Sequence, residues 1–443
     1  MRLRRSIYTL TMYLLTPLIL YRLAVRGLRY HEYFARWRER FGFFPDPHIR
    51  DSIWIHAVSM GEVNAAMPLI DALMQRYQGT PFVITTVTPT GSERVRRVYG
   101  DRVFNVYLPY DLPASIRRFL HRVRPRLAVV METEIWPNLF FECDAADIPV
   151  IIANARLSEK SLRGYGPVRP LARRALLSAR YIAAQSHTDA VRLKTLGADP
   201  SRLGIVGNLK YDMNVPSELT EQARTLRAAW GPRRPVWVAA STHDGEELPV
   251  IKAHAEVLRR FPDALLLLAP RHPERFKPVA MACRSFGFAT RTRSEDGCAT
   301  SDTQCFVVDT LGELLRFYAA SDVAFVGGSL VAIGGHNVLE PAAMSVPVIV
   351  GPNTFNFYEV TESLLEHGAA VRIDDGEELG ATVTRLFADD KLRQSTGRAA
   401  RMAFEREQGG VLRTVSIVEK VLDDAVDAAA TQVRSEARAS RAG

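Results

Sequence analysis

From residue 52 onward the chain repeats one pattern, in which a short apolar run is followed by a polar or glycine-containing turn and an amphipathic stretch. The apolar runs are continuous, as in strands that are buried on both faces, and this pattern favours parallel sheets covered by helices. Strands are expected at 53–58, 82–87, 104–108, 127–131, 150–153, 181–184, 203–206, 236–240, 265–269, 306–308, 323–326 and 346–350. Helices are expected at 63–77, 246–260 and 311–320.

One segment, 208–234, interrupts this alternation with prolines and glycines. A chain of 443 residues suits two or three domains. We therefore predict two Rossmann-like α/β units that face a central cleft. The expected parts are a basic, apolar arm at 1–40, a first unit at 41–212, a linker at 213–234, a second unit at 235–422 and a disordered tail, rich in Ala, Arg and Ser, at 423–443.

The positive charge is concentrated at the amino-terminal end. Of the formal net charge of +8, residues 1–50 contribute +7, from ten arginines against three acidic residues, which leaves +1 for the rest of the chain. The globular body is therefore nearly neutral, so we expect no nucleic-acid partner. An arginine-rich arm instead suits the anionic lipids of a membrane surface.

Between these arginines, the run 7–21 carries no charge. It is shorter than the ~20 apolar residues of a typical membrane span, contains Pro17, and is not followed by a small-residue cleavage site. We predict an uncleaved membrane anchor that either spans the bilayer or lies in its interface, with a buried core helix and a cleaved signal as alternatives. The flanking arginines and the four cysteines without CxxC spacing predict a cytoplasmic body.

Several common site motifs do not occur in the sequence, namely GxxxxGK[ST], GxGxxG after a strand, HExxH, CxxC and DxD. Their absence disfavours a P-loop enzyme, a dinucleotide-binding enzyme and a zinc hydrolase. We therefore expect neither a metal ion nor an organic cofactor.

Two acidic motifs follow predicted strands. The first, HAVSMGE at 56–62, leads into a helix and puts Glu62 at the carboxyl end of a strand, where ligands of parallel sheets gather. Alternatively, Glu62 only complements the positive end of that helix. The second, METEIWPN at 131–138, contains Glu132 and Glu134. These two carboxylates suit acid/base work or recognition of sugar hydroxyls, or they belong to a solvated loop with one N-cap.

A third motif, 327–341, is rich in glycine and lies between a buried strand and a helix. Glycines let backbone N–H groups approach an anion, and the helix N-terminus favours negative charge, so we predict phosphate or nucleotide binding. Asn337 and Glu340 have capping-box spacing, which explains those two side chains equally well. Arg271 and Lys210 are candidate supporting cations, although each taken singly is more often a surface ion-pair partner.

Seven motifs together resemble the 3-deoxy-D-manno-octulosonic acid (Kdo) transferases of lipopolysaccharide assembly. They read HAVSMGE, METEIWPN, NARLS, GNLKYD, STHDGEE, APRHPER and GGHNVLEPA, and the similarity extends from the arginine-rich arm to about residue 415. Each motif alone is weak, but the combination is specific. The resemblance implies a GT-B glycosyltransferase on the cytoplasmic face of the cell inner membrane. Such an enzyme moves Kdo from CMP-Kdo to the glucosamine disaccharide of a lipid A precursor, lipid IVA.

The resemblance also implies roles for single residues. Glu62 would be the general base, and transfer would invert the configuration of the sugar. The position of Glu62 near a helix N-terminus predicts that its carboxylate is ionised at neutral pH. Arg271 and the helix N-terminus, rather than Mg²⁺, would hold the departing charge. The implied donor-binding residues are Lys210, Ser241, Arg271, Gly334, Gly335, His336, Asn337 and Glu340, and the implied acceptor or cleft residues are Ser59, Gly61, Glu132 and Glu134.

Two other hypotheses stay open at this point. A nucleotide-sugar epimerase has the same two-domain form but needs no lipid acceptor, so the arm at 1–40 counts against it. A non-catalytic binder of membranes or nucleic acid, driven by the arginine arm, would bind in a strongly salt-dependent way. No motif indicates how many Kdo residues are added or what the oligomeric state is.

Overall fold

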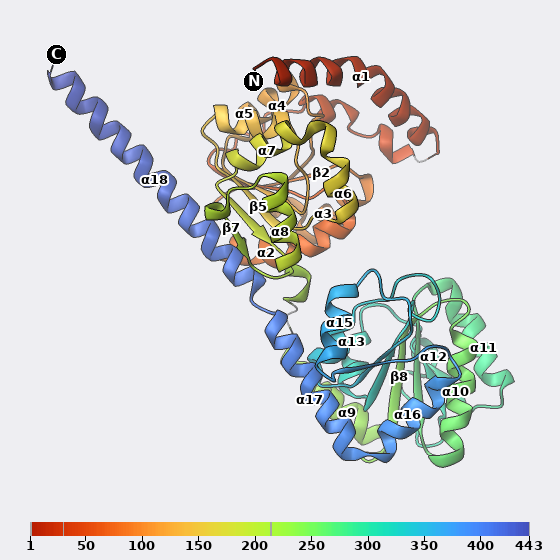
Figure 1. The fold of residues 1–443 in the computed structure, drawn as a ribbon. Coiled ribbons are helices and arrows are strands. Elements are labelled where there is room, and N and C mark those ends of the chain that lie inside the picture. The colour runs from red at the N-terminus through yellow and green to blue at the C-terminus, as the bar shows by residue number, and fades with distance from the viewer. Residues whose placement is uncertain (1, 30, 213–214, 443) are drawn as a thin grey trace. The chain divides into compact units, whose positions relative to one another are not determined.

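The computed structural model describes residues 2–29, 31–212 and 215–442, and the chain divides into two compact units (Figure 1). The N-terminal unit comprises Met1–Met213 and Gln408–Gly443. The C-terminal unit comprises Asn214–Glu407. Each unit contains a parallel sheet of seven strands with helices packed on it, as the continuous apolar runs predict.

The sheet of the N-terminal unit has the strand order β3-β2-β1-β4-β5-β6-β7. Its order reverses between the central strands β1 and β4, which pair in parallel with Ile55 opposite Val129. The strands are β1 (Ser52–His56), β2 (Phe82–Thr86), β3 (Phe104–Tyr107), β4 (Pro125–Met131), β5 (Val150–Ala155), β6 (Tyr181–Ala184) and β7 (Leu203–Ile205). The helices are α1 (Arg2–Arg29), α2 (Met60–Arg76), α3 (Pro89–Tyr99), α4 (Pro113–Val123), α5 (Pro137–Ala145), α6 (Glu159–Gly164), α7 (Arg169–Ser178), α8 (His187–Leu196) and α18 (Gly410–Ala442).

The sheet of the C-terminal unit has the order β10-β11-β9-β8-β12-β13-β14, and it reverses between β8 and β12. Its strands are β8 (Val236–Thr242), β9 (Leu265–Pro270), β10 (Thr290–Thr292), β11 (Cys305–Val307), β12 (Val323–Val326), β13 (Val348–Val350) and β14 (Ala370–Arg372). Its helices are α9 (Glu218–Trp230), α10 (Glu247–Arg260), α11 (Phe276–Ser285), α12 (Arg293–Asp296), α13 (Leu314–Ala319), α14 (Leu339–Ala343), α15 (Tyr358–Glu366), α16 (Glu378–Ala388) and α17 (Asp390–Glu407).

All twelve predicted strands are present, and two further strands were not predicted. The unpredicted strands β10 and β14 each have three residues and lie at opposite edges of the C-terminal sheet. Their sequences, TRT and AVR, contain no continuous apolar run, because an edge strand is not buried on both sides.

The sheets are buried on both faces. In β1, Ile53 and Ile55 belong to one apolar cluster while Trp54 belongs to another, as the alternation of side chains along a strand requires. In β8, Trp237 and Val238 are likewise assigned to different clusters. The rigid sheets therefore fix the positions of the loops that leave their strands.

Helix α18 differs from the prediction, because it belongs to the N-terminal unit rather than ending the second one. Val411, Val415, Val418 and Leu422 follow helical spacing and join the apolar cluster on one face of the N-terminal sheet. The helix continues to Ala442, through the segment expected to be disordered. Ala, Arg, Glu and Gln favour helix even where no apolar face remains, which explains this difference.

The predicted linker also contains ordered structure. Residues 213 and 214 lie outside the described part of the chain, but α9 occupies most of the remaining segment. Trp230 at its end is buried and stacks on Phe317, with ring centroids 6.5 Å apart. The helix is thus part of the C-terminal unit, and the prolines that suggested a linker lie just outside its two ends.

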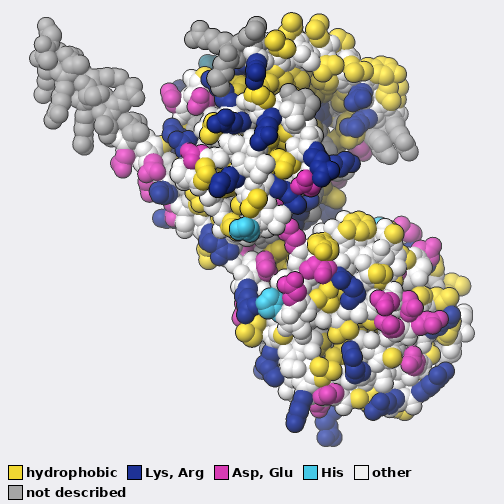
Figure 2. Space-filling model, viewed as in Figure 1, with side chains coloured by type: hydrophobic (Ala, Val, Ile, Leu, Met, Phe, Trp, Pro, Cys, Tyr) yellow, Lys and Arg dark blue, Asp and Glu magenta, His cyan; other side chains and the backbone are white. Residues whose placement is uncertain are grey.

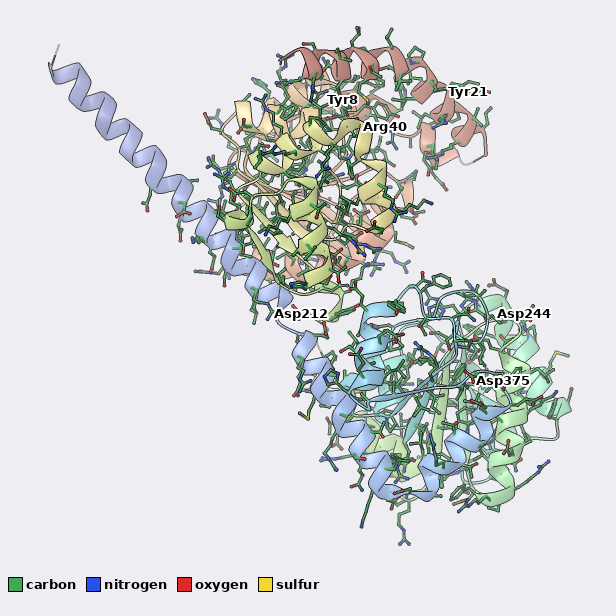
Figure 3. The ribbon with its side chains drawn as sticks, in the orientation of Figure 1. Tyr8, Tyr21, Arg40, Asp212, Asp244 and Asp375 are labelled. Carbon is green, nitrogen blue, oxygen red and sulfur yellow. The ribbon has the colours of Figure 1, made fainter. Side chains whose placement is uncertain are left out.

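Asp212 ties helix α18 to the N-terminal unit (Figure 3). Its carboxylate oxygens accept hydrogen bonds from the backbone N–H groups of Gly409 and Val411. We expect Asp212→Ala to lower the free energy of unfolding of this unit by about 1–2 kcal/mol, the usual effect of losing a helix cap. Urea denaturation measures this change. Asp423→Ala, at an exposed position on the same helix, is the control, and equal midpoints for both variants would contradict the capping role.

Candidate active site

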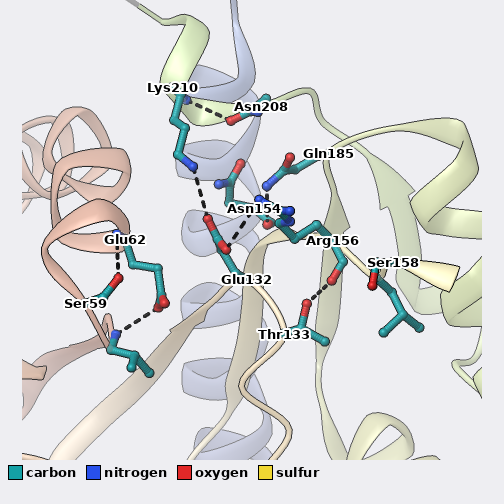
Figure 4. Close-up of polar contacts among 12 residues, drawn as sticks. Ser59, Glu62, Glu132, Thr133, Asn154, Arg156, Ser158, Gln185, Asn208 and Lys210 are labelled. Atoms are coloured by element: carbon teal, nitrogen blue, oxygen red, sulfur yellow. Dashed lines mark hydrogen bonds and ion pairs between the residues drawn. The ribbon is translucent and has the colours of Figure 1, made fainter. Parts of the chain in front are cut away.

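Glu62 lies in the first turn of α2, directly after the strand β1 (Figure 4). Ser59 is the N-cap of this helix, and its Oγ accepts a hydrogen bond from the N–H of Glu62 at 3.4 Å. The Oε2 atom of Glu62 accepts a hydrogen bond from the N–H of Val58 at 2.8 Å. No described residue has a recorded hydrogen bond to the other oxygen, Oε1. The alternative, in which Glu62 only complements the start of the helix, is therefore partly correct. One carboxylate oxygen accepts a backbone hydrogen bond, and the other is available to accept a proton from a substrate.

Two further carboxylates lie near Glu62, in the loop that follows the neighbouring strand β4. Glu132 has a left-handed backbone with φ of 56° and pairs with Lys210, whose Nζ is 3.4 Å from Oε1. Glu134 accepts a hydrogen bond from the indole N–H of Trp136 at 2.6 Å. The sequence-predicted residues Ser59, Gly61, Glu62, Glu132 and Glu134 thus gather where the order of the sheet reverses.

The environment of Glu62 raises the pKa of its carboxyl group to about 7. Burial is the largest cause, and the negative charges of Glu132 and Glu134 add to it, while the Val58 hydrogen bond and the Lys210 charge act in the opposite direction. The helix N-terminus led us to expect an ionised carboxylate at neutral pH, so burial outweighs that effect here. A carboxylate with such a pKa is suited to accept a proton near neutral pH.

The residues that support this cluster include some that sequence reasoning missed. Asn154, at the end of β5, has φ of 54°, and its Oδ1 accepts a hydrogen bond from the N–H of Leu209 at 3.0 Å. The Nε2 atom of Gln185 donates to the carbonyl of Asn154 at 2.9 Å. The sequence signal that could have identified Asn154 is a polar residue at the end of an apolar strand. These contacts hold the segment that carries Lys210.

Lys210 was expected among the donor-binding residues, next to the glycine turn. In the structure it belongs to the N-terminal unit and pairs with Glu132, while the glycine turn belongs to the C-terminal unit. The predicted bounds of the first unit, 41–212, already included Lys210, but the sequence did not reveal its ion pair with Glu132. Its observed effect is to counter the negative charge beside Glu62.

In the C-terminal unit, the buried carboxylate of Glu246 organises the loop after β12, and sequence reasoning missed this residue. Glu246 is fully buried, and its oxygens accept hydrogen bonds from the N–H groups of Gly328, Ser329 and Leu330 at 2.7–3.1 Å. A fourth bond comes from the N–H of His243 at 2.9 Å. These amides are therefore occupied by the protein's own carboxylate.

This arrangement corrects the expected role of the glycines. The N–H groups of Gly334 and Gly335 both donate to the carbonyl of Gly328, at 3.0 and 2.8 Å, so they close a turn rather than face an anion. Gly327 is required by packing, because a Cβ there would lie 2.6 Å from the carbonyl oxygen of Ser241. The helix that follows, α14, has only five residues. The glycines shape the loop, and its side chains remain as the groups available to a ligand.

Those side chains lie at the carboxyl ends of β8, β9 and β12. His336 stacks on His243 with ring centroids 5.1 Å apart, and the Nδ2 atom of Asn337 donates to Glu340 at 3.3 Å. Burial and the nearby charge of Arg271 lower the pKa of His336 to about 4, so its ring is neutral at pH 7. Arg271 itself is exposed.

The two units thus offer different chemistry. The N-terminal unit presents a half-buried carboxylate that can take a proton, and the C-terminal unit presents an exposed guanidinium with imidazole, amide and carboxyl groups around it. Within the described residues, no three His, Cys, Asp or Glu side chains are grouped so that they could hold a metal ion.

Comparisons with known proteins identify the family of this chain. A family model described as 3-Deoxy-D-manno-octulosonic-acid transferase (kdotransferase) matches residues 35–213. The 3-deoxy-D-manno-octulosonic acid transferase of Haemophilus influenzae is 41% identical over 425 residues, covering 95% of this chain and 99% of that protein. The transferase of the same name from Bordetella pertussis is 36% identical over 428 residues, covering 94% and 99%.

Among solved structures, the UDP-GlcNAc 2-epimerase from Neisseria meningitidis bound to UDP-GlcNAc matches with a TM-score of 0.56 at 13% identity. The match covers 84% of this chain and 100% of that one. This likeness concerns the fold, which is GT-B. By its sequence, the chain belongs to the 3-deoxy-D-manno-octulosonic acid transferases, so the predicted family is confirmed. The protein is a glycosyltransferase of lipopolysaccharide biosynthesis.

The raised pKa of Glu62 predicts a pH-dependent effect on stability. A carboxyl group with a higher pKa in the folded state stabilises the fold while it is protonated. This stability is fully present below the pKa of the unfolded state, and it is lost as the pH rises through the folded-state pKa of about 7. Glu62→Gln removes this loss. As the pH rises from acidic to mildly alkaline values, we expect the free energy of unfolding of the variant to increase by about 1–3 kcal/mol relative to that of the unmodified protein.

Urea denaturation at several pH values measures this gain. Glu93→Gln, at an exposed position on α3, is the matched control and should show no such trend. A stability difference for Glu62→Gln that does not change with pH would contradict the raised pKa.

Proposed function

We propose that this protein transfers Kdo from CMP-Kdo to the glucosamine disaccharide of a lipid A precursor, lipid IVA, with inversion of configuration. The observation that carries the proposal is the Glu62 carboxyl group, which is held by Val58 and has a pKa of about 7. A sugar hydroxyl is a weak nucleophile, and a positioned base that removes its proton during attack accelerates transfer.

In the proposed reaction Glu62 is the general base. Its carboxylate accepts the proton of the acceptor hydroxyl while the hydroxyl oxygen forms a bond to the anomeric carbon of Kdo. The bond from that carbon to the phosphate oxygen breaks, and CMP leaves with the electron pair. Attack from the face opposite CMP inverts the configuration. Ser59, Gly61, Glu132 and Glu134 surround the base and contact the acceptor sugar.

The donor is bound by the C-terminal unit in this proposal. Arg271 contacts the phosphate of CMP, since an exposed guanidinium next to neutral polar groups suits an anion. His336 and Asn337 contact the phosphate or the cytidine, and Glu340 contacts the ribose hydroxyls. Gly334 and Gly335 hold these side chains through their turn, and Ser241, with φ of 56°, lies at the end of the adjacent strand β8. Lys210, which pairs with Glu132 beside Glu62, also contacts the donor in this proposal.

The acceptor is a membrane lipid, and we propose that the protein works at the cytoplasmic face of the cell inner membrane. The support is α1, in which Arg4–Leu28 is long and apolar enough to cross a membrane by length and composition. Holding the enzyme on the leaflet that contains its acceptor raises the local acceptor concentration. The arginines of the arm attract anionic lipids to the same surface.

We expect Glu62→Gln to lower the rate of Kdo transfer by about 10²–10⁴-fold, because an amide cannot accept the hydroxyl proton. With the unmodified enzyme, kcat/KM should rise with pH through about 7, as the carboxyl group ionises. Product formation from CMP-Kdo and lipid IVA is followed by mass spectrometry of the lipid. Glu93→Gln serves as the control.

Transfer that survives Glu62→Gln would reject the base assignment. Release of free Kdo, or of an isomer of the donor, without any lipid-linked product would reject the transferase reaction in favour of epimerase-like chemistry.

We expect Arg271→Ala to raise the KM for CMP-Kdo by about 10–100-fold, since a hydrogen bond from a charged group is worth about 1.5–3 kcal/mol. The KM for the lipid acceptor should change little. Arg284→Ala, at an exposed position on α11 of the same unit, is the matched control. An unchanged donor KM in Arg271→Ala would exclude its contact with the phosphate.

A further inference from the structure

Helix α1 has two different faces. Along one side, large apolar residues are exposed at helical spacing, and Figure 2 shows hydrophobic side chains gathered over this helix. We call this face the apolar stripe, and its main members are Ile7, Leu10, Leu14, Leu18, Tyr21 and Val25. Leu14 is 71% exposed and Tyr21 is 66% exposed. Such a face in contact with water is unfavourable, so it needs a cover.

The opposite face of α1 is attached to the body of the N-terminal unit by polar contacts near its start. The Nη2 atom of Arg5 lies 2.5 Å from Oε1 of Glu142. The hydroxyl of Tyr8, which Figure 3 labels, donates to Oδ2 of Asp111 at 2.7 Å, and Asp111 is only 1% exposed. Releasing these contacts would leave buried carboxylates with fewer partners, which is costly.

A third contact continues this row. The hydroxyl of Thr9 donates to Oδ1 of Asn138 at 3.1 Å, and Asn138 is fully buried. Tyr8 and Thr9 lie inside the apolar run, where a spanning helix would be immersed in lipid. Their partners belong to the loop before α4 and to α5, so these helix residues are fixed to the folded body.

The segment that follows α1 is attached to the same unit. The chain folds back directly after the helix, and a Cβ on Gly27 would meet the ring of Phe34 at 2.5 Å. Arg36 then donates to Ser92 at 2.9 Å, and the buried Arg40 donates to the carbonyl of Val87, also at 2.9 Å. The start of the helix and the segment that follows its end are therefore held on one folded unit, whereas a spanning helix has its ends on opposite sides of the bilayer.

Length supports the same conclusion. The whole segment Arg4–Leu28 is long enough to cross a membrane, but its uncharged part, between Arg5 and Arg22, forms a helix of only about 24 Å. This is shorter than the ~30 Å hydrocarbon core of a bilayer. An interfacial helix, which dips only its apolar face into the lipid, has no such length requirement.

We propose that α1 lies in the plane of the membrane surface, with the apolar stripe in the lipid and the polar face on the body, and does not cross the bilayer. The inference rests on the membrane association proposed above and concerns its geometry. The partner that covers the apolar stripe is a membrane leaflet that contains anionic phospholipids.

The charge beside the helix matches this occupant. A cavity of about 1140 Å³ is lined by Arg4 at the start of α1 and by basic residues of α7 and α8. Its cationic lining residues are Arg4, Arg169, Arg173, Arg174 and Lys194, against a single lining carboxylate, Asp199. Lipid phosphates are the anions that a membrane surface supplies to such a cavity, at about 1 kcal/mol for each basic residue.

The test measures the depth of α1 in lipid. Single cysteines replace Leu10, Leu14, Leu18 and Val25 one at a time in the full chain, with Cys298 changed to Ser, and each carries a nitroxide label. Vesicles of phosphatidylcholine and phosphatidylglycerol are the probe, and collision with oxygen and with a water-soluble nickel complex reports depth. Met12→Cys, on the inward side of the helix, is the control for a label that faces protein.

An in-plane helix gives the same shallow depth at all four positions. A depth that is greatest at Leu14 and falls toward both ends would overturn the in-plane geometry while leaving membrane association intact. Failure to bind the vesicles at all would instead reject the membrane association on which the inference rests.

A second pair of variants tests the polar attachment. Tyr8→Phe combined with Thr9→Val should accelerate amide hydrogen exchange in the first turns of α1 by about tenfold or more, since two hydrogen bonds to the body are lost. Tyr13→Phe, on the exposed side, should leave exchange unchanged. Equal exchange in both variants would show that these contacts do not hold the helix on the body.

The basic cavity is tested with the same vesicles. Arg173→Ala combined with Lys194→Ala should reduce the preference for phosphatidylglycerol-containing vesicles over pure phosphatidylcholine by about tenfold or more. Arg284→Ala combined with Lys252→Ala, at exposed positions of the other unit, is the control for loss of two positive charges. An unchanged preference would exclude lipid phosphates from the cavity.

Discussion

The geometry of parallel sheets determines where this protein can do chemistry. All strands of a parallel sheet end at the same edge, and the loops separate where the strand order reverses, which leaves room for a ligand. In the N-terminal unit that point lies between β1 and β4, the strands that precede Glu62 and Glu132. In the C-terminal unit that point lies between β8 and β12. Strand β8 contains Ser241, and β12 leads into the loop at 327–338. The candidate site residues follow from this one constraint.

The two units use a carboxylate after their central strand for different purposes. Glu62 accepts one backbone N–H, from Val58, and has a pKa of about 7 because it is buried near other carboxylates. Glu246 accepts four backbone N–H groups and holds a loop in place. A carboxylate saturated with donors is structural, whereas one with an oxygen to spare can take part in proton transfer.

Much of this organisation was predictable from the sequence, because central strands of parallel sheets have continuous apolar runs. Glu62 and Glu132 were identifiable because they directly follow such runs. The role of Glu246 was not, since its motif does not reveal which amides its carboxylate meets. The partner of Lys210 and the return of α18 to the first unit depend on contacts between residues distant in the chain, which periodicity does not encode. The pKa of Glu62 depends on burial that only the folded structure determines.

The same limit applies to the amino-terminal arm. Its composition indicates affinity for a membrane but is compatible with both a spanning and an interfacial helix. Hydrogen bonds from Tyr8 and Thr9 to buried groups of the body distinguish the two geometries. The proposed membrane attachment and the proposed general base thus belong to one unit, which contains both α1 and Glu62.

Burial in the folded protein raises the pKa of the Glu62 carboxyl group, so that this group exchanges a proton near neutral pH. Carbon-13 NMR of protein labelled at the glutamate carboxyl carbons tests it most directly, with Glu62→Gln assigning the resonance. We expect a titration midpoint near 7 for this carboxyl group. A midpoint close to the ordinary value of 4.5 would contradict it.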